Sequence, residues 1–146
     1  MQTQNPYATP KSSIIESNGE ITEGKIESLL VSPVWKERFK AIYLAGGPKL
    51  TNIKNIPKSE RRKAFKFNIL AFLFGPIYYL SKGMWRKAIL YTVAALIILV
   101  ALGMLLEYLG YSKIANSLHF GASAFFAVRA NIDFYKKAVL EENGWW

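Results

Sequence analysis

The longest apolar run in the chain extends from Ala88 to Leu106 and contains no charged residue. Its nineteen residues would form a helix of about 28 Å, close to the hydrocarbon thickness of a bilayer, about 30 Å. Mostly apolar residues continue the run to Leu109. The pattern therefore predicts a transmembrane helix over residues 88–109.

A second apolar run, from Ile114 to Val128, lies between Lys113 and Arg129 and has only fifteen residues. Both flanking cations can extend toward lipid headgroups, which lengthens the effective span. We therefore expect a second transmembrane helix over residues 114–130. With the first helix it would form a hairpin closed by a short outer loop.

A shorter apolar segment, residues 67–80, precedes both runs. As a helix it would span about 21 Å, too little for an upright crossing. The Gly75-Pro76 pair also interrupts a helix, because proline lacks the amide donor and crowds the preceding turn. The interpretation that we favour is a re-entrant or interfacial segment, with its basic flanks kept on the cytoplasmic side. The alternative is a tilted or kinked full crossing, extended by a few residues at both ends.

The N-terminal half of the chain is polar. Residues 1–30 show no sustained period and have the composition of a disordered tail. Ser32-Pro33 matches an N-cap followed by proline at the first helical position, and a Gly-Gly-Pro stop follows at residues 46–48. Residues 31–66 are thus predicted to form a basic cytoplasmic amphipathic helix and a linker, and residues 141–146 a C-terminal tail.

The predicted amphipathic helix carries its large apolar side chains on one face. These side chains are Trp35, Phe39, Ile42 and Tyr43. A basic helix with aromatic residues on its apolar side suits a membrane interface. The same face could pack on the protein's own helices, and the two interpretations are not exclusive.

Positive charge is concentrated just before the apolar part. The net charge is +9, and residues 31–66 carry ten Lys or Arg against two Glu. With hydrophobic spans nearby, anionic lipid is a closer polyanion than nucleic acid, which we consider the less favoured partner. The cations predicted to contact lipid headgroups are Arg61, Arg62, Lys63, Lys66, Arg86 and Lys87.

Several kinds of chemistry have no support in the sequence. The chain has no cysteine and a single histidine, so a thiolate or multi-histidine metal site within one chain is excluded. No phosphate-binding loop, nucleophile elbow or zinc-protease motif is present. We expect no enzyme activity, no cofactor and no metal. The first thirty residues contain no apolar core of a secretory signal, so we expect them to stay on the mature protein.

Two aromatic-rich motifs resemble the signature of a small bacterial inner-membrane family catalogued as domain of unknown function 2628. The first motif comprises Phe67-Asn68, Ala71-Phe72, residues 74–80 (FGPIYYL) and residues 82–85 (KGMW). The second is Ala130-Asn131-Ile132-Asp133-Phe134-Tyr135, and the resemblance covers about residues 33–140. It implies a bacterial inner-membrane location and no agreed activity, and no fixed role is carried over to Asp133 or Phe134.

The candidate interaction residues come from these two motifs. They are Asn68, Phe74, Gly75, Pro76, Lys82, Met84, Trp85, Asn131 and Tyr135. Arg129, Asn131 and Asp133 could also form a small polar site that faces the bend at Gly75-Pro76, or they could cap and end the last helix.

The sequence thus predicts an all-α membrane protein. It would contain a transmembrane helical hairpin, a short Gly-Pro-broken hydrophobic segment and an N-terminal amphipathic helix, with residues 67–140 as the membrane domain. We expect a multi-pass protein of the bacterial inner membrane with both termini in the cytoplasm. Its partners would be the bilayer, its anionic headgroups, and another membrane protein or itself.

The predicted function is that of a lipid-contacting and protein-interacting membrane module. One alternative is an oligomeric transport or channel component in which His119, Asn116 and Glu107 line a path. Another is a membrane enzyme that uses Asp133 and Asn131.

Overall fold

The computed structural model describes residues 23–145, which form helices joined by short turns. No strand occurs within these residues, so the predicted all-helical class is confirmed for this part of the chain. Most of the predicted N-terminal tail and the last residue, Trp146, lie outside the described residues.

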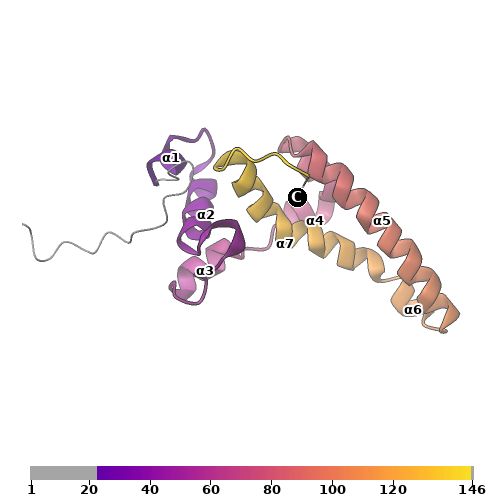
Figure 1. Ribbon diagram of the computed structural model, residues 1–146. Coiled ribbons are helices and arrows are strands. Elements are labelled where there is room, and N and C mark those ends of the chain that lie inside the picture. The colour runs from indigo at the N-terminus through magenta and orange to yellow at the C-terminus, as the bar shows by residue number, and fades with distance from the viewer. Residues whose placement is uncertain (1–22, 146) are drawn as a thin grey trace, which may run out of the picture.

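The helices form one platform and one arm. In chain order they are α1 (Glu23–Ser28), α2 (Pro33–Leu44), the 3₁₀ turn η1 (Gly47–Lys49), α3 (Lys58–Ala64), α4 (Ile69–Ser81), α5 (Trp85–Tyr108), α6 (Ser112–Ala115) and α7 (Leu118–Ala138). Figure 1 shows α1, α2 and α3 gathered at one end, and we call these three helices the platform. Helix α5 extends away from them as an arm. From α6, helix α7 runs back to the platform, and α4 packs on both α7 and α5.

Helix α2 begins and ends at the predicted signals. Proline occupies its first turn after Ser32, and Gly46 follows its end with a φ of +95°, a conformation that favours glycine. Its residues Phe39 and Ile42 are fully buried, and Trp35 meets Phe134 of α7 edge-on at 4.7 Å between ring centroids. The apolar face of α2 therefore packs on the protein's own helices, the second of the two interpretations.

Helix α4 is broken in its middle. Gly75 has φ +43° and ψ −115°, outside the helical region, and Pro76 follows it without an amide donor. Residues 68 and 78 would lie about 15 Å apart along a straight helix, yet the Asn68 amide donates to the Tyr78 hydroxyl at 2.9 Å. The chain therefore turns back at Gly75.

Two helical stretches of the described chain are long and apolar enough to cross a membrane: Lys58–Ser81 and Trp85–Tyr108. The first is not a straight rod, because non-helical residues at 65–68 separate α3 from α4 and Gly75 breaks α4 again. The second is α5, which is continuous and is hardly buried inside the protein.

The boundaries of the predicted hairpin helices need correction. Helix α5 begins at Trp85, three residues before the predicted start at 88. The predicted helix over residues 114–130 is divided between α6 and α7, and α7 continues to Ala138. It continues past the apolar run because the polar residues that follow are buried and hydrogen-bonded, as the next subsection describes.

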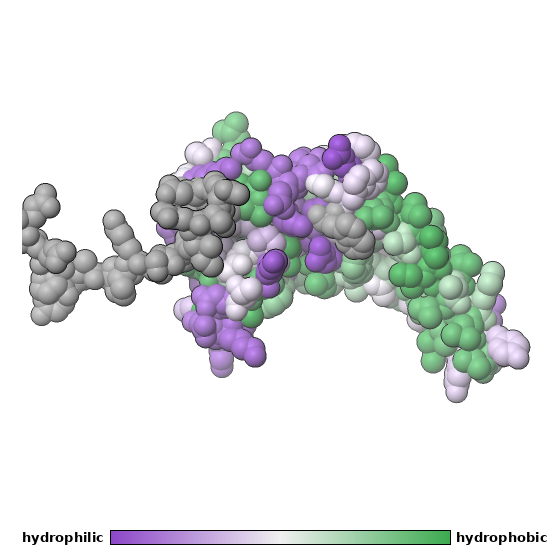
Figure 2. Space-filling model, in the orientation of Figure 1, coloured by the Kyte–Doolittle hydropathy of each residue, from purple (hydrophilic) through white to green (hydrophobic). Residues whose placement is uncertain are grey.

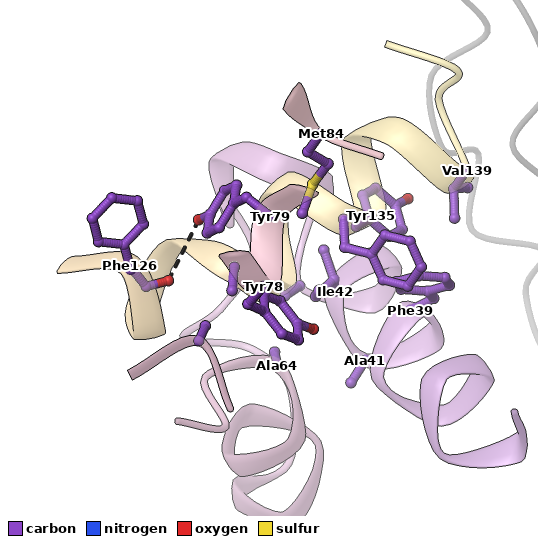
Figure 3. Packing of buried hydrophobic residues seen from close by; sticks show 14 of the residues in the cluster. Phe39, Ala41, Ile42, Ala64, Tyr78, Tyr79, Met84, Phe126, Tyr135 and Val139 are labelled. Atoms are coloured by element: carbon purple, nitrogen blue, oxygen red, sulfur yellow. Dashed lines mark hydrogen bonds between the residues drawn. The ribbon is translucent and has the colours of Figure 1, made fainter. Parts of the chain in front are cut away.

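The core lies where α2, α4 and α7 meet at the platform end. Figure 3 shows Phe39 and Ile42 of α2 packed near Tyr78 of α4 and Tyr135 of α7. Aromatic rings dominate this core, and most of their contacts are edge-on or tilted, the arrangement that such pairs prefer. The broken helix is thus held between the platform and the last helix.

Candidate functional site

Asn68 is the polar centre of the turn into α4. Its Oδ1 accepts a hydrogen bond from the Ala71 amide at 3.1 Å, the geometry of a helix N-cap. Its side-chain amide donates to the Tyr78 hydroxyl and, at 3.1 Å, to Oδ1 of Asn131. One buried side chain therefore joins the start of α4, the half of α4 beyond the break, and α7.

Asp133, two residues after Asn131 on α7, forms a second buried cluster. Its carboxylate is fully buried and accepts a hydrogen bond from the Tyr79 hydroxyl at 3.1 Å. Its Oδ1 lies 3.2 Å from Nζ of Lys87, which is itself 1% exposed, and 3.3 Å from the Arg129 guanidinium. Side chains from α4, α5 and α7 thus converge on one carboxylate.

In both clusters, a buried polar side chain has its hydrogen-bonding partners in place. A buried charge is tolerated only when it is paired and hydrogen-bonded, and Asp133 meets both conditions. The Tyr79 hydroxyl also lies 3.4 Å from the Phe126 carbonyl oxygen (Figure 3). Arg129 is only partly buried and donates to the Tyr91 hydroxyl at 3.4 Å.

This arrangement holds α4, α5 and α7 together. Lys87 and Arg129 neutralise Asp133, and Asn68 has its amide and carbonyl groups occupied. Within residues 23–145, no group of three or more His, Asp or Glu side chains is placed to hold a metal ion.

The structure brings some of the predicted motif residues together and separates others. Asn68 and Asn131 are in direct contact, and Gly75 lies against the Phe126 ring. Met84 is fully buried and its amide donates to the Tyr79 carbonyl. Phe74 and Trp85 instead have exposed rings, and Pro76 is half-buried.

Lys82 and Tyr135 have different surroundings. The Lys82 ammonium lies 5.0 Å from the centroid of Phe134 and 5.5 Å from that of Trp35, both cation–π distances. Tyr135 is fully buried and packs on Phe39, but its hydroxyl has no hydrogen-bond partner among the described residues. Burial raises the pKa of this hydroxyl to about 12.

The cations predicted to contact headgroups fall into separate classes. Arg62, Lys66 and Arg86 are exposed. Arg61 donates to the carbonyl groups of residues 53 and 54, and Lys63 pairs with Glu60 at 3.1 Å.

Lys87 was wrongly predicted as a headgroup contact. It lies on the inward face of α5 with Ala88 and Tyr91, so its ammonium reaches Asp133 of α7 instead of the surface. A signal for this placement is present in the sequence, because Lys87 and Tyr91 are four residues apart, as are Arg129 and Asp133. The partnership of Tyr79 with Asp133 joins residues far apart in the chain, and no local pattern in the sequence predicts it.

The residues of the predicted transport path lie at the far end of the arm. His119 is exposed, and its Nδ1 is 2.8 Å from the carbonyl oxygen of Asn116, three residues earlier. Glu107 is also exposed, at the end of α5. These contacts are local, so they do not line an interior path through the described part of one chain.

Comparison with known proteins gives one family. The family described as Protein of unknown function (DUF2628) matches residues 28–139. Uncharacterized protein YigF of Salmonella typhimurium is 30% identical over 115 residues, 79% of this chain and 73% of that protein. Its counterpart in Escherichia coli is 30% identical over 114 residues, covering 78% and 72% of the two chains. No solved structure matches this chain.

Proposed function

Since the chain belongs to the DUF2628 family, as its motifs predicted, and that family is described only as one of unknown function, we propose a function from the chain's own structure. The protein is a non-enzymatic, multi-pass module of the bacterial inner membrane that contacts anionic lipid headgroups. Its broken helix α4 is re-entrant, and both termini are cytoplasmic. A partner protein, also expected from the sequence, stays a prediction.

The observation that carries this proposal is the exposed apolar surface of α5. The helix has 24 residues and a length of about 36 Å. Leu96, Ile97 and Ile98 at its centre are all exposed, and Ile97 retains 64% of its accessible surface. Soluble monomers rarely expose continuous apolar surface of this size. Lipid is the environment that such a helix favours.

The distribution of polar surface supports an orientation. Figure 2 shows hydrophilic residues over the platform and hydrophobic residues along the arm formed by α5. Because positive charge tends to stay in the cytoplasm, the basic platform would lie on the cytoplasmic side. Helix α5 would then cross outward, and the apolar first half of α7 would return.

The geometry of α4 supports the re-entrant interpretation. Lys66 and Lys82, at the two ends of the segment, line the same cavity. Positive charge at both ends can therefore stay on one side of the bilayer, which a full crossing would not allow. Asn68 at the start of the segment and Tyr79 after the break are both hydrogen-bonded to α7, and polar groups at membrane depth need such partners.

The buried clusters support a structural module. Lys87 and Asp133 are neutralised where α5, α4 and α7 converge. A pair of this kind fixes the relative placement of the helices and gives no open reaction site. The cluster thus connects α4, α5 and α7 to one another.

The test is a charge placed at the middle of α5. In a bilayer, Ile97→Asp makes the free energy of membrane insertion less favourable by about 3 kcal/mol, because residue 97 lies at the helix centre. A smaller fraction of this variant therefore stays in bacterial membranes during alkaline carbonate extraction. In a protein surrounded by water, the same change would be harmless, because Ile97 is already exposed. Tyr108→Asp, at the end of α5, is the matched control and extracts like the unmodified protein. Equal extraction of all three proteins, or release of the unmodified protein by carbonate, overturns the proposal.

A further inference from the structure

A cavity of about 270 Å³ lies between α2 and the two ends of the broken helix. Arg38 and Trp35 contribute the α2 wall, while Lys66 precedes α4 and Lys82 follows it. The buried side chains of Asn68 and Tyr78 line the cavity as well. The re-entrant geometry therefore creates this cavity, because it brings the entrance and the exit of the segment to the same place.

The charge of the cavity is all of one sign. Arg38, Lys66 and Lys82 line it, and no carboxylate does. None of these three cations forms an ion pair within residues 23–145. The cations nearby on α2 and α3 differ, because Lys36, Lys40 and Lys63 pair with glutamates. The cavity thus concentrates positive charge that the described chain does not neutralise.

One donor in the cavity wall also lacks an acceptor. The Nε of Arg38 is buried and has no hydrogen-bond partner within the described residues. Buried donors in native proteins nearly always have a partner, and a charged donor gains most from an anionic one. The Arg38 guanidinium lies 4.7 Å from the Trp35 ring centroid, and the Lys82 ammonium lies 5.5 Å from it. The same ring therefore positions two of the cations.

The mouth of the cavity continues into apolar surface. Val34 of α2 and Phe67, Ile69 and Leu70 at the start of α4 line it, and all four side chains are exposed. A free phosphate or a polar metabolite would leave this surface in water. A phospholipid would place its phosphate among the cations and its acyl chains against these residues.

We propose that this cavity binds the phosphate of an anionic phospholipid, with Arg38, Lys66 and Lys82 as its ligands. The proposal rests on the membrane placement proposed above and names the lipid chemistry that the platform recognises. Charge complementarity and the adjoining apolar surface favour lipid over the other occupants, an acidic peptide or a second copy of this chain.

The test is lipid binding to the full chain, purified in a neutral detergent and followed by native mass spectrometry. The probes are phosphatidylglycerol and phosphatidylcholine with the same acyl chains. Removing one cation near a membrane surface lowers affinity about fivefold, the equivalent of about 1 kcal/mol. Arg38→Gln and Lys82→Gln therefore each weaken phosphatidylglycerol binding about fivefold, and each weakens phosphatidylcholine binding less, because the choline ammonium offsets the phosphate charge.

The controls separate a specific cavity from general positive charge. Lys54→Gln and Lys58→Gln remove exposed cations outside the cavity and leave the preference for phosphatidylglycerol intact. Equal losses in these controls, or no loss in the cavity variants, overturn the proposal. If Arg38→Gln does not fold, Lys66→Gln replaces it, because Lys66 is exposed and its ammonium forms no ion pair with the described residues.

A soluble competitor distinguishes lipid from free phosphate. Glycerophosphoglycerol carries the same phosphodiester without acyl chains, so it displaces phosphatidylglycerol only at far higher concentrations. Displacement at equal concentrations overturns the assignment to lipid. Carbonate extraction separates a failure of the lipid site from a failure of the membrane placement. If only the lipid site is wrong, the unmodified chain and the cavity variants all stay in the membrane fraction. Release of the unmodified chain contradicts the membrane placement itself.

Discussion

Replacing Asp133 with asparagine tests the buried cluster most severely. Asp133→Asn keeps the size of the side chain but removes its charge. The Lys87 ammonium, 1% exposed and 3.2 Å from the carboxylate, then remains buried without a counterion. Arg129 is less affected, because its guanidinium is partly exposed and retains the Tyr91 hydroxyl.

The expected loss follows from the geometry of the Lys87–Asp133 pair. At 3.2 Å and an effective dielectric constant of about 20, the attraction between the two charges is about 5 kcal/mol. Part of that attraction offsets the cost of desolvating both ions. Removing one partner leaves the other ion unpaired, so we expect Asp133→Asn to lower the free energy of unfolding by about 3–5 kcal/mol.

A double-mutant cycle measures this coupling. Unfolding in detergent micelles is followed by far-UV circular dichroism during titration with sodium dodecyl sulfate. Lys87→Met alone costs about 2 kcal/mol, because Asp133 keeps Tyr79 and Arg129 as donors. The double variant, which has neither buried charge, loses less than the sum of the single variants.

The control for the cycle is Glu141→Gln, which changes an exposed carboxylate paired with Lys25 and leaves stability unchanged. The reasoning is refuted if Asp133→Asn is as stable as the unmodified protein. It is also refuted if the two single changes are strictly additive, because ions in contact must be coupled.

Three further predictions use the same unfolding assay or hydrogen exchange. Gly75→Ala destabilises by about 1–3 kcal/mol, since alanine is strained at φ +43° and ψ −115° although its Cβ would have room; unchanged stability would contradict the break. Tyr79→Phe lowers the free energy of unfolding by about 1–3 kcal/mol, because it removes a donor to a buried carboxylate. Tyr135→Phe leaves it unchanged, because the lost hydroxyl has no partner among the described residues. A larger loss for Tyr135→Phe than for Tyr79→Phe would be inconsistent with the structure. The Lys40 ammonium lowers the pKa of the Glu27 carboxyl below 4.5. The pair therefore stabilises α1 above that pH, and this stabilisation is lost as the pH falls through the lowered pKa. On acidification, the amide protection factors of α1 should fall relative to those of α2; if they do not, the pair does not hold α1.

The local signals in the sequence predict much of the helical fold. The Ser32-Pro33 start and the glycine stop define α2 closely, because capping depends on a few adjacent residues. The Gly75-Pro76 pair indicates the break in α4 for the same reason. The uninterrupted apolar run identifies α5 apart from its first turn, where Arg86 and Lys87 obscure the helix start.

Long-range partnerships are what the sequence does not reveal. In the sequence, Asp133 is one of several polar residues that follow an apolar run, and capping of the last helix also accounts for it. Its role depends on Lys87 and Tyr79, which are 46 and 54 residues away in the chain. The cavity is equally dependent on the fold, because Arg38 and Lys82 come together only when α4 turns back.

Single-cysteine labelling tests the central claim most directly, namely that the chain is embedded in the inner membrane with α4 re-entrant. The chain has no native cysteine, and Ser81 and Ser112 are both exposed, at the end of α4 and the start of α6. In intact spheroplasts, a membrane-impermeant maleimide is expected to label Ser112→Cys and to label Ser81→Cys only after the membrane is opened. Labelling of Ser81→Cys from outside would contradict the re-entrant segment, and protection of Ser112→Cys until lysis would contradict the hairpin.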